Sequence, residues 1–484
     1  MKTLNTGMVS LLAATLLVAC GGGSGYSAGT MNGGADQTAS LTTTGTITAF
    51  GAASGNVTVG ATAFDGNGAA ITMDDQPATE TDLEVGQSVT VSANAAVGPE
   101  MARASRIDAH HRVVGPVASV DIASSTFVVL GQTVKITDDT SFASSITPTD
   151  ITGIHAGDLV AVFGMAAADG SIVATRIHPA VAARGDFVGG VVAALNATAH
   201  TFRINGLTVD YTTAILSGFT AAGPANGDAV WVHGSSFDAT TTTLTATAVR
   251  KFPVFMGRVE REGLVTRFAS ITDFDIDGQA VTTTSATVYR NGTAADVVLN
   301  ASLEAHGSVD AAGKMTAAVI EIEHRGIYAL VAPATAINAT AGTLTVLGVM
   351  VTVDARTRFE DLGPAHVRDL ALGNLAANDV VAVRGYESPA GSGNLLATRI
   401  DRLPATLMTV GVVGPYTGTA QPQFKILGVV VDTAAATFSA NRMMPLTATQ
   451  FFAQAPGHNV AVLGTGSAPV VASRVLILPP GDDD

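Results

Sequence analysis

The residues that most directly suggest chemistry are the aspartates of Asp273–Val281, which reads DFDIDGQAV. The spacing D-x-D-x-D-G opens the calcium-binding loop of helix-loop-helix proteins, which also needs a bidentate glutamate at its twelfth position. That position holds Thr284, and the preceding residues, GLVTRFASIT, lack helical periodicity. The motif itself alternates between acidic and apolar side chains, as a strand does. We therefore interpret it as a β-hairpin with its aspartates on the solvent face, and not as a calcium site.

The same frame recurs along the chain. Related stretches are TFVVLGQTV (126–134), TFRINGLTV (201–209), TLTVLGVMV (343–351) and QFKILGVVV (423–431). In each of them an apolar residue stands where Phe274 and Ile276 stand, and a glycine stands where Gly278 stands. Apolar residues on one face and variable residues on the other predict a half-buried strand that turns at the glycine.

These stretches belong to a longer repeating unit. Equivalent strand residues are 75, 72, 70 and 80 positions apart, a spacing that indicates a tandem array. Each unit opens with a G-x-V strand, as in GPVASVD (115–121), and later carries a block such as GDLVAVFG (157–164) and a closing strand such as ATRI (174–177). Six copies, the first and fourth degenerate, cover nearly everything from residue 42 to residue 480.

The order of elements predicts the fold class. Three strands, a short helix and two more strands in about 70 residues fit a small five-stranded barrel of the OB type. The sequence thus predicts an all-β tandem array of about six small barrels, each with at most a short helix. An SH3-like barrel is the alternative, because strand order alone does not fix how the sheet closes. Barrel closure would also hide sheet edges in a chain that is 47% hydrophobic.

The recurring blocks resemble a bacterial repeat family known as a domain of unknown function, family 5666. The matching motifs are G-x-V, TF-x-V-x-G-x-x-V, GD-x-V-x-V-x-G and A-T-R-I. The resemblance is good in the second, third, fifth and sixth copies and weak in the first and fourth. It implies tandem small barrels in a secreted protein or lipoprotein of a Gram-negative bacterium. It implies no catalytic residues, since the family has no established activity.

The N-terminal segment predicts where the protein resides. An apolar run from Met8 to Ala19 is too short to span a membrane and is typical of a secretory signal. Leu17–Cys20 reads LVAC, which resembles the site cut by lipoprotein signal peptidase, and Cys20 is the only cysteine in the chain. We predict a lipid on Cys20 that anchors the protein in the cell envelope. Gly21 after the cysteine favours the outer membrane, with the periplasmic leaflet and the cell surface both open.

The predicted organisation follows from these boundaries. A signal peptide (1–19) precedes a flexible Gly- and Ser-rich tether (20–41). The repeats are expected at 42–111, 112–183, 184–252, 253–324, 325–404 and 405–480, before an acidic tail at 481–484.

Composition excludes one common use of small barrels. Single-stranded nucleic acid needs a basic groove and stacking aromatics, but the net charge is −15 and aromatic residues make up 5% of the chain. We therefore expect no nucleic-acid partner. Trp231, the single tryptophan, is interpreted as an outward-facing strand residue.

The histidines show none of the usual metal-ligand spacings. His110 and His111 are adjacent, so on a strand they would point to opposite faces. His233 and His306 occupy one repeat position whose residue type varies among copies, which we interpret as a surface position. The sequence therefore predicts no metal site and no cofactor.

Arginines recur in the closing strand, at Arg106, Arg176, Arg399 and Arg474. We interpret them as cross-strand partners of acidic neighbours, because two copies lack the arginine. No nucleophile elbow, catalytic carboxylate pair or phosphate loop occurs in a credible context. We therefore expect no enzyme and no catalytic residues.

Two function hypotheses remain. The first is a non-enzymatic envelope lipoprotein, an elongated spacer or docking module for an envelope protein or glycan, held to the membrane by its lipid. The alternative is a ligand-binding or enzymatic lipoprotein whose site forms between repeats.

Overall fold

The computed structural model describes residues 40–51, 55–94, 101–181, 184–407, 409–440 and 444–478. The chain is all-β, with 56% of it in strands and one short helix, which confirms the predicted class. The predicted signal peptide, Cys20, most of the tether and the acidic tail lie outside the described residues. Among the described residues, no helix has the length and apolar character needed to cross a membrane.

The first three repeats are described by the following strands. Repeat 1 contains β1 (Ser40–Phe50), β2 (Asn56–Val59), β3 (Thr62–Asp65), β4 (Ala70–Met73), β5 (Gln76–Ala78), β6 (Ser88–Asn94) and β7 (Ala102–Ala109). Repeat 2 contains β8 (Val113–Asp121), β9 (Thr126–Val129), β10 (Gln132–Lys135), β11 (Ser141–Phe142), β12 (Leu159–Ala166) and β13 (Ile172–Pro179). Repeat 3 contains β14 (Asp186–Val191), β15 (Ala193–Asn196), β16 (Thr201–Ile204), β17 (Leu207–Asp210), β18 (Ile215–Ser217), β19 (Ala229–Asp238) and β20 (Thr243–Lys251).

The last three repeats follow the same plan. Repeat 4 contains β21 (Gly257–Ser270), β22 (Asp273–Ile276), β23 (Gln279–Thr282), β24 (Val288–Arg290), β25 (Ser302–Val309) and β26 (Met315–Glu323). Repeat 5 contains β27 (Tyr328–Asn338), β28 (Thr343–Val346), β29 (Val349–Thr352), β30 (Arg358–Asp361), β31 (Val380–Glu387) and β32 (Leu395–Arg402). Repeat 6 contains β33 (Val410–Pro415), β34 (Thr417–Ala420), β35 (Gln423–Ile426), β36 (Val429–Asp432), β37 (Thr437–Ala440), β38 (Met444–Leu446), α1 (Ala448–Gln454), β39 (Asn459–Thr465) and β40 (Val470–Ile477).

The predicted short helix before the fourth strand is present only in repeat 6, as α1. In repeats 1, 2, 4 and 5 a single 3₁₀ turn takes its place, at Glu80–Asp82, Ile151–Gly153, Ala294–Asp296 and Leu372–Asn374. Pro- and Ala-bearing stretches of this length are too short to hold an α-helix without tertiary packing. In α1 that packing comes from Phe451, which is fully buried.

Within each repeat the backbone coils around a core. In repeat 2, β8 pairs with β9, β9 with β10, β10 with β13, and β12 with both β13 and β8. β10 and β13 pair in parallel, so the chain must cross over from one end of this pair to the other between them. Along the whole chain this winding makes a β-solenoid of about 11 turns and not a row of separate closed barrels. The prediction of about six separate OB-like or SH3-like barrels is therefore wrong.

The repeats are not separate units, because the first strand of a repeat also has a partner in another repeat. β8 pairs antiparallel with β14, β27 pairs antiparallel with β33, and β1 pairs in parallel with β21. Repeats 2 and 3, repeats 5 and 6, and repeats 1 and 4 thus share sheets of 13, 14 and 13 strands. A strand pattern in a sequence indicates that a strand pairs, but not how many partners it has.

The hydrophobic cores follow this pairing for two of the three pairs of repeats. One cluster spans repeats 2 and 3 and includes Phe127 and Phe202, and another spans repeats 5 and 6 and includes Phe424. Repeats 1 and 4 have their own clusters, around Phe64 and Phe274. The expectation of six separate cores is therefore also wrong.

The recurring frame is a hairpin, as predicted. In DFDIDGQAV, β22 and β23 pair antiparallel, and Phe274 and Ile276 are fully buried between them and the rest of repeat 4. Asp277 and Gly278 turn the chain with φ values of 46° and 78°. Two consecutive positive φ values are the mark of a type I′ turn, which explains why glycine recurs at this position.

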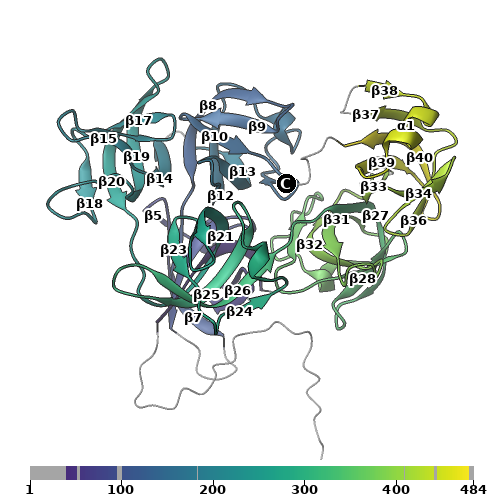
Figure 1. The fold of residues 1–484 in the computed structure, drawn as a ribbon, viewed down its shortest axis with the longest axis horizontal. Helices are drawn as coiled ribbons and strands as arrows, with labels where there is room; N and C mark the ends of the chain where they lie inside the picture. The colour runs from purple at the N-terminus through teal and green to yellow at the C-terminus, as the bar shows by residue number, and fades with distance from the viewer. Residues whose placement is uncertain are drawn as a thin grey trace, which may run out of the picture.

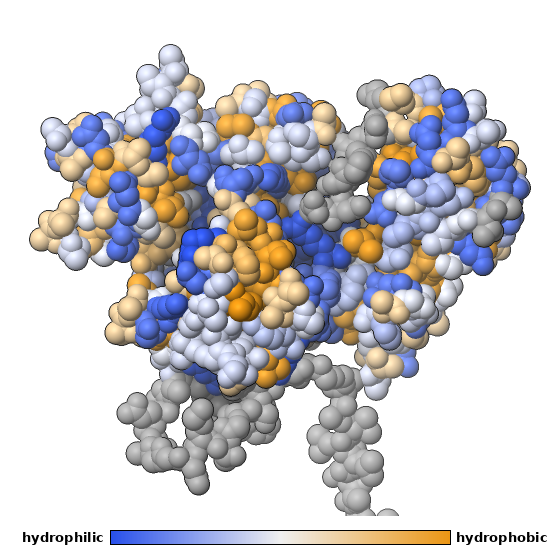
Figure 2. Space-filling view, viewed as in Figure 1, coloured by the Kyte–Doolittle hydropathy of each residue, from blue (hydrophilic) through white to orange (hydrophobic). Residues whose placement is uncertain are grey.

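Figure 1 shows how the pairs are placed. Repeats 1 and 4 lie at the lower centre, repeats 2 and 3 at the upper left, and repeats 5 and 6 at the right. Ion pairs join repeats that are distant in sequence: Arg176 of repeat 2 to Glu360 of repeat 5, and Arg368 of repeat 5 to Glu80 of repeat 1. Figure 2 shows hydrophilic surface in the hollow between the central repeats and those at the right.

Candidate functional site

The outer face of repeat 4 carries a cluster of glutamates. Glu260 and Glu262 lie on β21, Glu304 on β25, and Glu321 and Glu323 on β26. These strands are neighbours, and the register places Glu304 directly opposite both Glu262 and Glu321. Alternate residues of a strand share a face, so the carboxyl groups gather on one side of the sheet. Glu260, Glu304 and Glu321 are only 3%, 1% and 7% exposed, which is rare for charged side chains.

Repeat 1 covers part of this glutamate cluster through the parallel pair of β1 and β21. The hydroxyl of Thr43 donates to Glu260 Oε2 at 2.8 Å. The backbone N–H and the hydroxyl of Thr46 donate to the two carboxylate oxygens of Glu262 at 2.7 and 2.9 Å. Gly45 makes this approach possible, because a Cβ there would lie 2.6 Å from Glu262 Oε2.

Repeat 5 covers the other part with an arginine. Arg356 Nη2 lies 2.8 Å from Glu304 Oε2 and 2.7 Å from Glu321 Oε2, so one guanidinium joins two carboxylates. Asn291 Nδ2 donates to the other oxygen of Glu321 at 3.0 Å, and the hydroxyl of Ser302 donates to Glu323 Oε2 at 2.7 Å. Buried charges need such partners, because their desolvation is costly.

Burial also changes the protonation of the cluster. It raises the pKa of Glu323 to about 8, and the neighbouring charges of Glu262 and Glu304 add to the rise. Burial likewise raises the pKa of Glu262, where Glu304 opposes ionisation. Burial alone would also raise the pKa of Glu260, but contact with His306 and the hydroxyls of Thr43 and Thr62 lowers it overall. The cluster thus combines neutral and ionised carboxyl groups.

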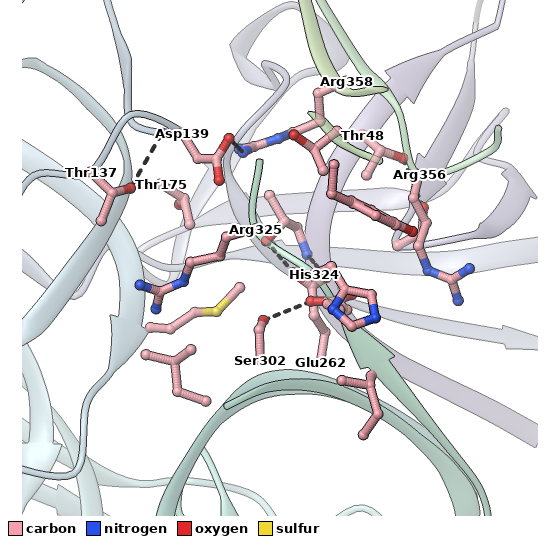
Figure 3. A pocket seen from close by; sticks show the side chains of 18 of the residues that line it. Thr48, Thr137, Asp139, Thr175, Glu262, Ser302, His324, Arg325, Arg356 and Arg358 are labelled. Atoms are coloured by element: carbon pink, nitrogen blue, oxygen red, sulfur yellow. Dashed lines mark hydrogen bonds and ion pairs between the residues drawn. The ribbon is translucent and has the colours of Figure 1, made fainter. Parts of the chain in front are cut away.

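A cavity of about 170 Å³ adjoins the cluster where repeats 1, 2, 4 and 5 meet. Figure 3 shows polar side chains entering it from all four repeats. Its polar lining consists of Thr46, Thr48, Thr137, Asp139, Thr175, Glu262, Asn291, Ser302, Glu323, His324, Arg325, Asp354, Arg356, Arg358, Tyr386 and Thr398. The cavity is therefore a product of the way the repeats assemble and not of any one repeat.

Several polar atoms of the cavity wall lack hydrogen-bond partners among the described residues. Thr175 is 9% exposed, and its hydroxyl has no hydrogen bond among the described residues, nor has Asp139 Oδ1. Arg358 is directed at Asp139, with 3.6 Å between Nη2 and Oδ1. Arg325 enters from the segment between repeats 4 and 5 and has no ion-pair partner in the part of the chain that the structure describes. Unpartnered buried polar groups are uncommon in native proteins and often mark a site for water or a ligand.

Next to the cavity, the recurring arginines of the closing strand meet at one carboxylate. Arg176 Nη1 and Arg399 Nη2 lie 3.0 and 2.8 Å from the two oxygens of Glu360. The two arginines are 6% and 4% exposed. Arg106 instead pairs with Asp108 of its own strand at 2.6 Å, largely in solvent. The interpretation as cross-strand partners of acidic neighbours is confirmed for Arg399, whereas Arg106 pairs within its own strand and Arg176 pairs with a glutamate of another repeat. Arg474 is exposed.

The aspartates of the calcium-like motif have two different environments. Asp273 and Asp275 form ion pairs with Arg267, at 2.7 and 2.8 Å. Asp277 is 8% exposed at its side chain and lies between Arg112 of repeat 2 and Arg261. The prediction that the aspartates line the solvent face is therefore wrong for Asp277.

The histidines are less exposed than expected. His111 contacts Asp74 at 2.6 Å and His178 at 2.8 Å, and burial together with His111 lowers the pKa of His178 to about 3. His110 points away from this group and stacks on Trp231 with 3.9 Å between ring centroids, so the two adjacent histidines do have separate environments.

His233 and His306 occupy no free surface position. The side chain of His233 is 21% exposed and that of His306 is 15% exposed, because neighbouring strands or other repeats cover them. Trp231 is half-buried on the outer face of its strand, against His110 and Phe252. The surface interpretation of the histidine position is therefore wrong, because the outer faces of these strands are covered by other repeats.

One signal in the sequence marks the glutamate cluster. In repeat 4 the outward positions of three strands are acidic, as in GRVERE (257–262), LEAHG (303–307) and VIEIEH (319–324). The equivalent of Glu304 is Ala161 in repeat 2 and Trp231 in repeat 3. Acidic residues on all three strands of a single copy indicate that this copy differs in what covers it, but not what the cover is.

Three segments of the chain match the family described as Domain of unknown function (DUF5666), at residues 114–178, 262–321 and 333–401. They fall in repeats 2, 4 and 5, which supports the resemblance inferred from the motifs. Repeat 4 is among them, although its motifs are weak. A search of curated proteins gives no match to this chain.

Proposed function

We propose that this protein is a non-enzymatic lipoprotein of the Gram-negative cell envelope that binds a small polar ligand in the cavity between its repeats. The anchor would be a lipid on Cys20, for which the sequence LVAC at 17–20 is the support. Outer-membrane attachment is the location that Gly21 favours.

The single observation that carries this proposal is a cavity built by four repeats whose wall holds buried polar atoms without hydrogen bonds. A spacer or docking rod needs no internal cavity, and buried polar atoms without hydrogen bonds reduce stability. Their presence at the one place where repeats 1, 2, 4 and 5 meet favours a binding protein over a spacer. The ion pairs between repeats that are not neighbours in sequence favour it too.

The wall chemistry suggests the class of ligand. Arg325 and Arg358 offer guanidinium groups, which suit a carboxylate or another oxyanion. Glu262 and Glu323, whose pKa values are raised by burial, and the hydroxyl of Thr175 would complete a set of hydrogen-bonding groups. A volume of about 170 Å³ holds a small molecule and excludes polymers. We therefore infer a small organic anion.

Thermal shift with a panel of small organic acids tests the proposal. We expect one class of acids to raise the melting temperature of the wild-type chain, because a ligand that binds only the folded state stabilises it. The shift should disappear in Arg325→Ala and persist in Arg203→Ala, a matched change at an exposed arginine. A shift retained in Arg325→Ala, or no shift with any acid at millimolar concentration, would contradict the proposal.

A further inference from the structure

Three metal-ligating side chains of repeat 4 converge beside the cavity. Glu260 and His306 are directly opposed across β21 and β25, and Glu304 points to the same face from two residues along β25. One ligand atom from each side chain lies within 4.8 Å of the other two. The strand register therefore fixes a set of two carboxylates and one imidazole.

The gaps within this set are wider than hydrogen bonds. His306 Nδ1 lies 3.4 Å from Glu260 Oε1, and Nε2 lies 3.5 Å from Glu304 Oε1. Nitrogen–oxygen hydrogen bonds are usually about 2.9 Å long. Nδ1 of His306 is itself buried and has no hydrogen-bond partner among the described residues. The imidazole thus lies at ion-pair distance from both carboxylates, and its buried Nδ1 makes no hydrogen bond to either among the described residues.

The spacing suits a small divalent ion. Ligand atoms at about 2.1 Å from a tetrahedral Zn²⁺ stand about 3.4 Å apart. A metal takes one nitrogen of the ring, and because the ligand atoms lie within 4.8 Å of one another, a closure of at most roughly 1.4 Å reaches that spacing. Small side-chain rotations supply a movement of this size.

Each carboxylate is already oriented through its other oxygen. Glu260 Oε2 accepts hydrogen bonds from the hydroxyls of Thr43 at 2.8 Å and Thr62 at 3.0 Å. Glu304 Oε2 accepts from Arg356 Nη2 at 2.8 Å. In both residues Oε1 is left facing the imidazole. Outer contacts of this kind orient the ligands in protein metal sites.

Local charge and space also favour a cation. Three carboxyl groups of the cluster, those of Glu260, Glu304 and Glu321, contact two basic groups among the described residues, Arg356 and His306. A divalent ion would offset the surplus of negative charge at low dielectric. Gly60 leaves room above Glu304, since a Cβ there would lie 3.2 Å from one of its oxygens.

We propose that Glu260, Glu304 and His306 form a site for a first-row divalent cation, of which Zn²⁺ fits the nitrogen and oxygen donors and their spacing best. A water molecule would complete the coordination. The site is separate from the proposed ligand cavity and does not depend on it. Without a metal, the same geometry would hold an imidazolium between two carboxylates, and the experiment must separate these two states.

Metal titration of the full chain tests the proposal. The purified chain is stripped with EDTA and titrated with Zn²⁺, and in parallel with Co²⁺, whose visible absorption reports its coordination. We expect one tightly bound ion per chain, with Mg²⁺ and Ca²⁺ binding far more weakly because they prefer oxygen ligands. In His306→Gln and in Glu260→Gln the affinity should fall by at least about 100-fold.

His155→Gln is the matched control, because the side chain of His155 is 70% exposed, and this variant should bind as the wild type does. Melting temperatures in EDTA check that each variant folds. If the ligand variants fail to fold, anomalous X-ray scattering from wild-type crystals grown with Zn²⁺ locates the ion directly. Binding of much less than one ion per chain, unchanged affinity in both ligand variants, or an anomalous peak elsewhere would overturn the proposal and leave the imidazolium state.

Discussion

Single residues of repeat 4 have environments that their counterparts in other copies lack. Glu304 stands where repeat 2 has Ala161, yet it is 1% exposed and bonded to Arg356 of another repeat. In repeat 4 this variable position is therefore one at which two repeats contact each other. The consequence for chemistry is a cluster of carboxyl groups, some of which stay protonated near neutral pH.

Glu323 should make stability depend on pH. Its pKa is raised from 4.5 to about 8, mainly by burial and then by Glu262 and Glu304. Between these values the folded chain holds a proton that the unfolded chain releases, so the free energy of unfolding falls as pH rises. The slope from this group reaches at most about 1.4 kcal/mol per pH unit. Below pH 4.5 and above pH 8 we expect no contribution to the slope.

Glu323→Gln should remove this decline. Denaturant unfolding in EDTA from pH 5 to pH 8.5 measures it, with Asp138→Asn at an exposed carboxylate as the control. The stability of Glu323→Gln relative to the wild type should increase steadily across this range, whereas Asp138→Asn should follow the wild type. A constant difference between Glu323→Gln and the wild type would show that Glu323 ionises normally.

Cys20 is the other residue with a defined expectation. The mature protein should begin at a lipid-modified Cys20, because LVAC ends the apolar run of the leader. Mass spectrometry of the membrane fraction measures the N-terminal mass, and Cys20→Ser should accumulate the uncut precursor. An unmodified Cys20, or cleavage at another residue, would refute the anchor.

At the scale of elements, the hairpin β22–β23 shows what a strand pattern predicts and what it omits. The alternation of DFDIDGQAV correctly predicts that Phe274 and Ile276 are buried, and its Asp-Gly pair correctly predicts the turn. The pattern does not predict that Asp277 lies between Arg112 and Arg261, because Arg112 comes from repeat 2. Similarly, at most a short helix was expected in each repeat, and among the described residues an α-helix forms only in repeat 6, where Phe451 packs beneath it.

The two environments of the motif predict two different costs for one chemical change. Asp277→Asn should lower the free energy of unfolding by about 3–5 kcal/mol, since it leaves Arg112 and Arg261 without their carboxylate. Asp275→Asn, two residues away and paired only with the exposed Arg267, should change it by no more than about 0.5 kcal/mol. Denaturant unfolding compares them. Equal costs would contradict the placement of Asp277, and a calcium-dependent stabilisation lost in Asp275→Asn would restore the ion-binding interpretation.

At the scale of the whole molecule, the tandem repetition could be predicted from the sequence, but the contacts between repeats could not. Hydrophobic alternation reports burial against the core of the same repeat. The second pairing of β1, β8 and β27, and the contact of Arg176 with Glu360, depend on residues in other repeats, between 73 and 217 positions away. The cavity and the glutamate cluster arise from these contacts, which is why motif reading missed them.

The central claim is that repeats distant in sequence meet around a common cavity. Its most direct test is a double-mutant cycle between Arg176 of repeat 2 and Glu360 of repeat 5, whose charged atoms lie 3.0 Å apart. Denaturant unfolding of Arg176→Gln, Glu360→Gln and the double variant gives the coupling energy between the two side chains. We expect about 1–3 kcal/mol, as for contacting residues in a buried network. A coupling below about 0.3 kcal/mol, as for distant independent sites, would mean that the repeats do not meet in solution and that no common cavity exists.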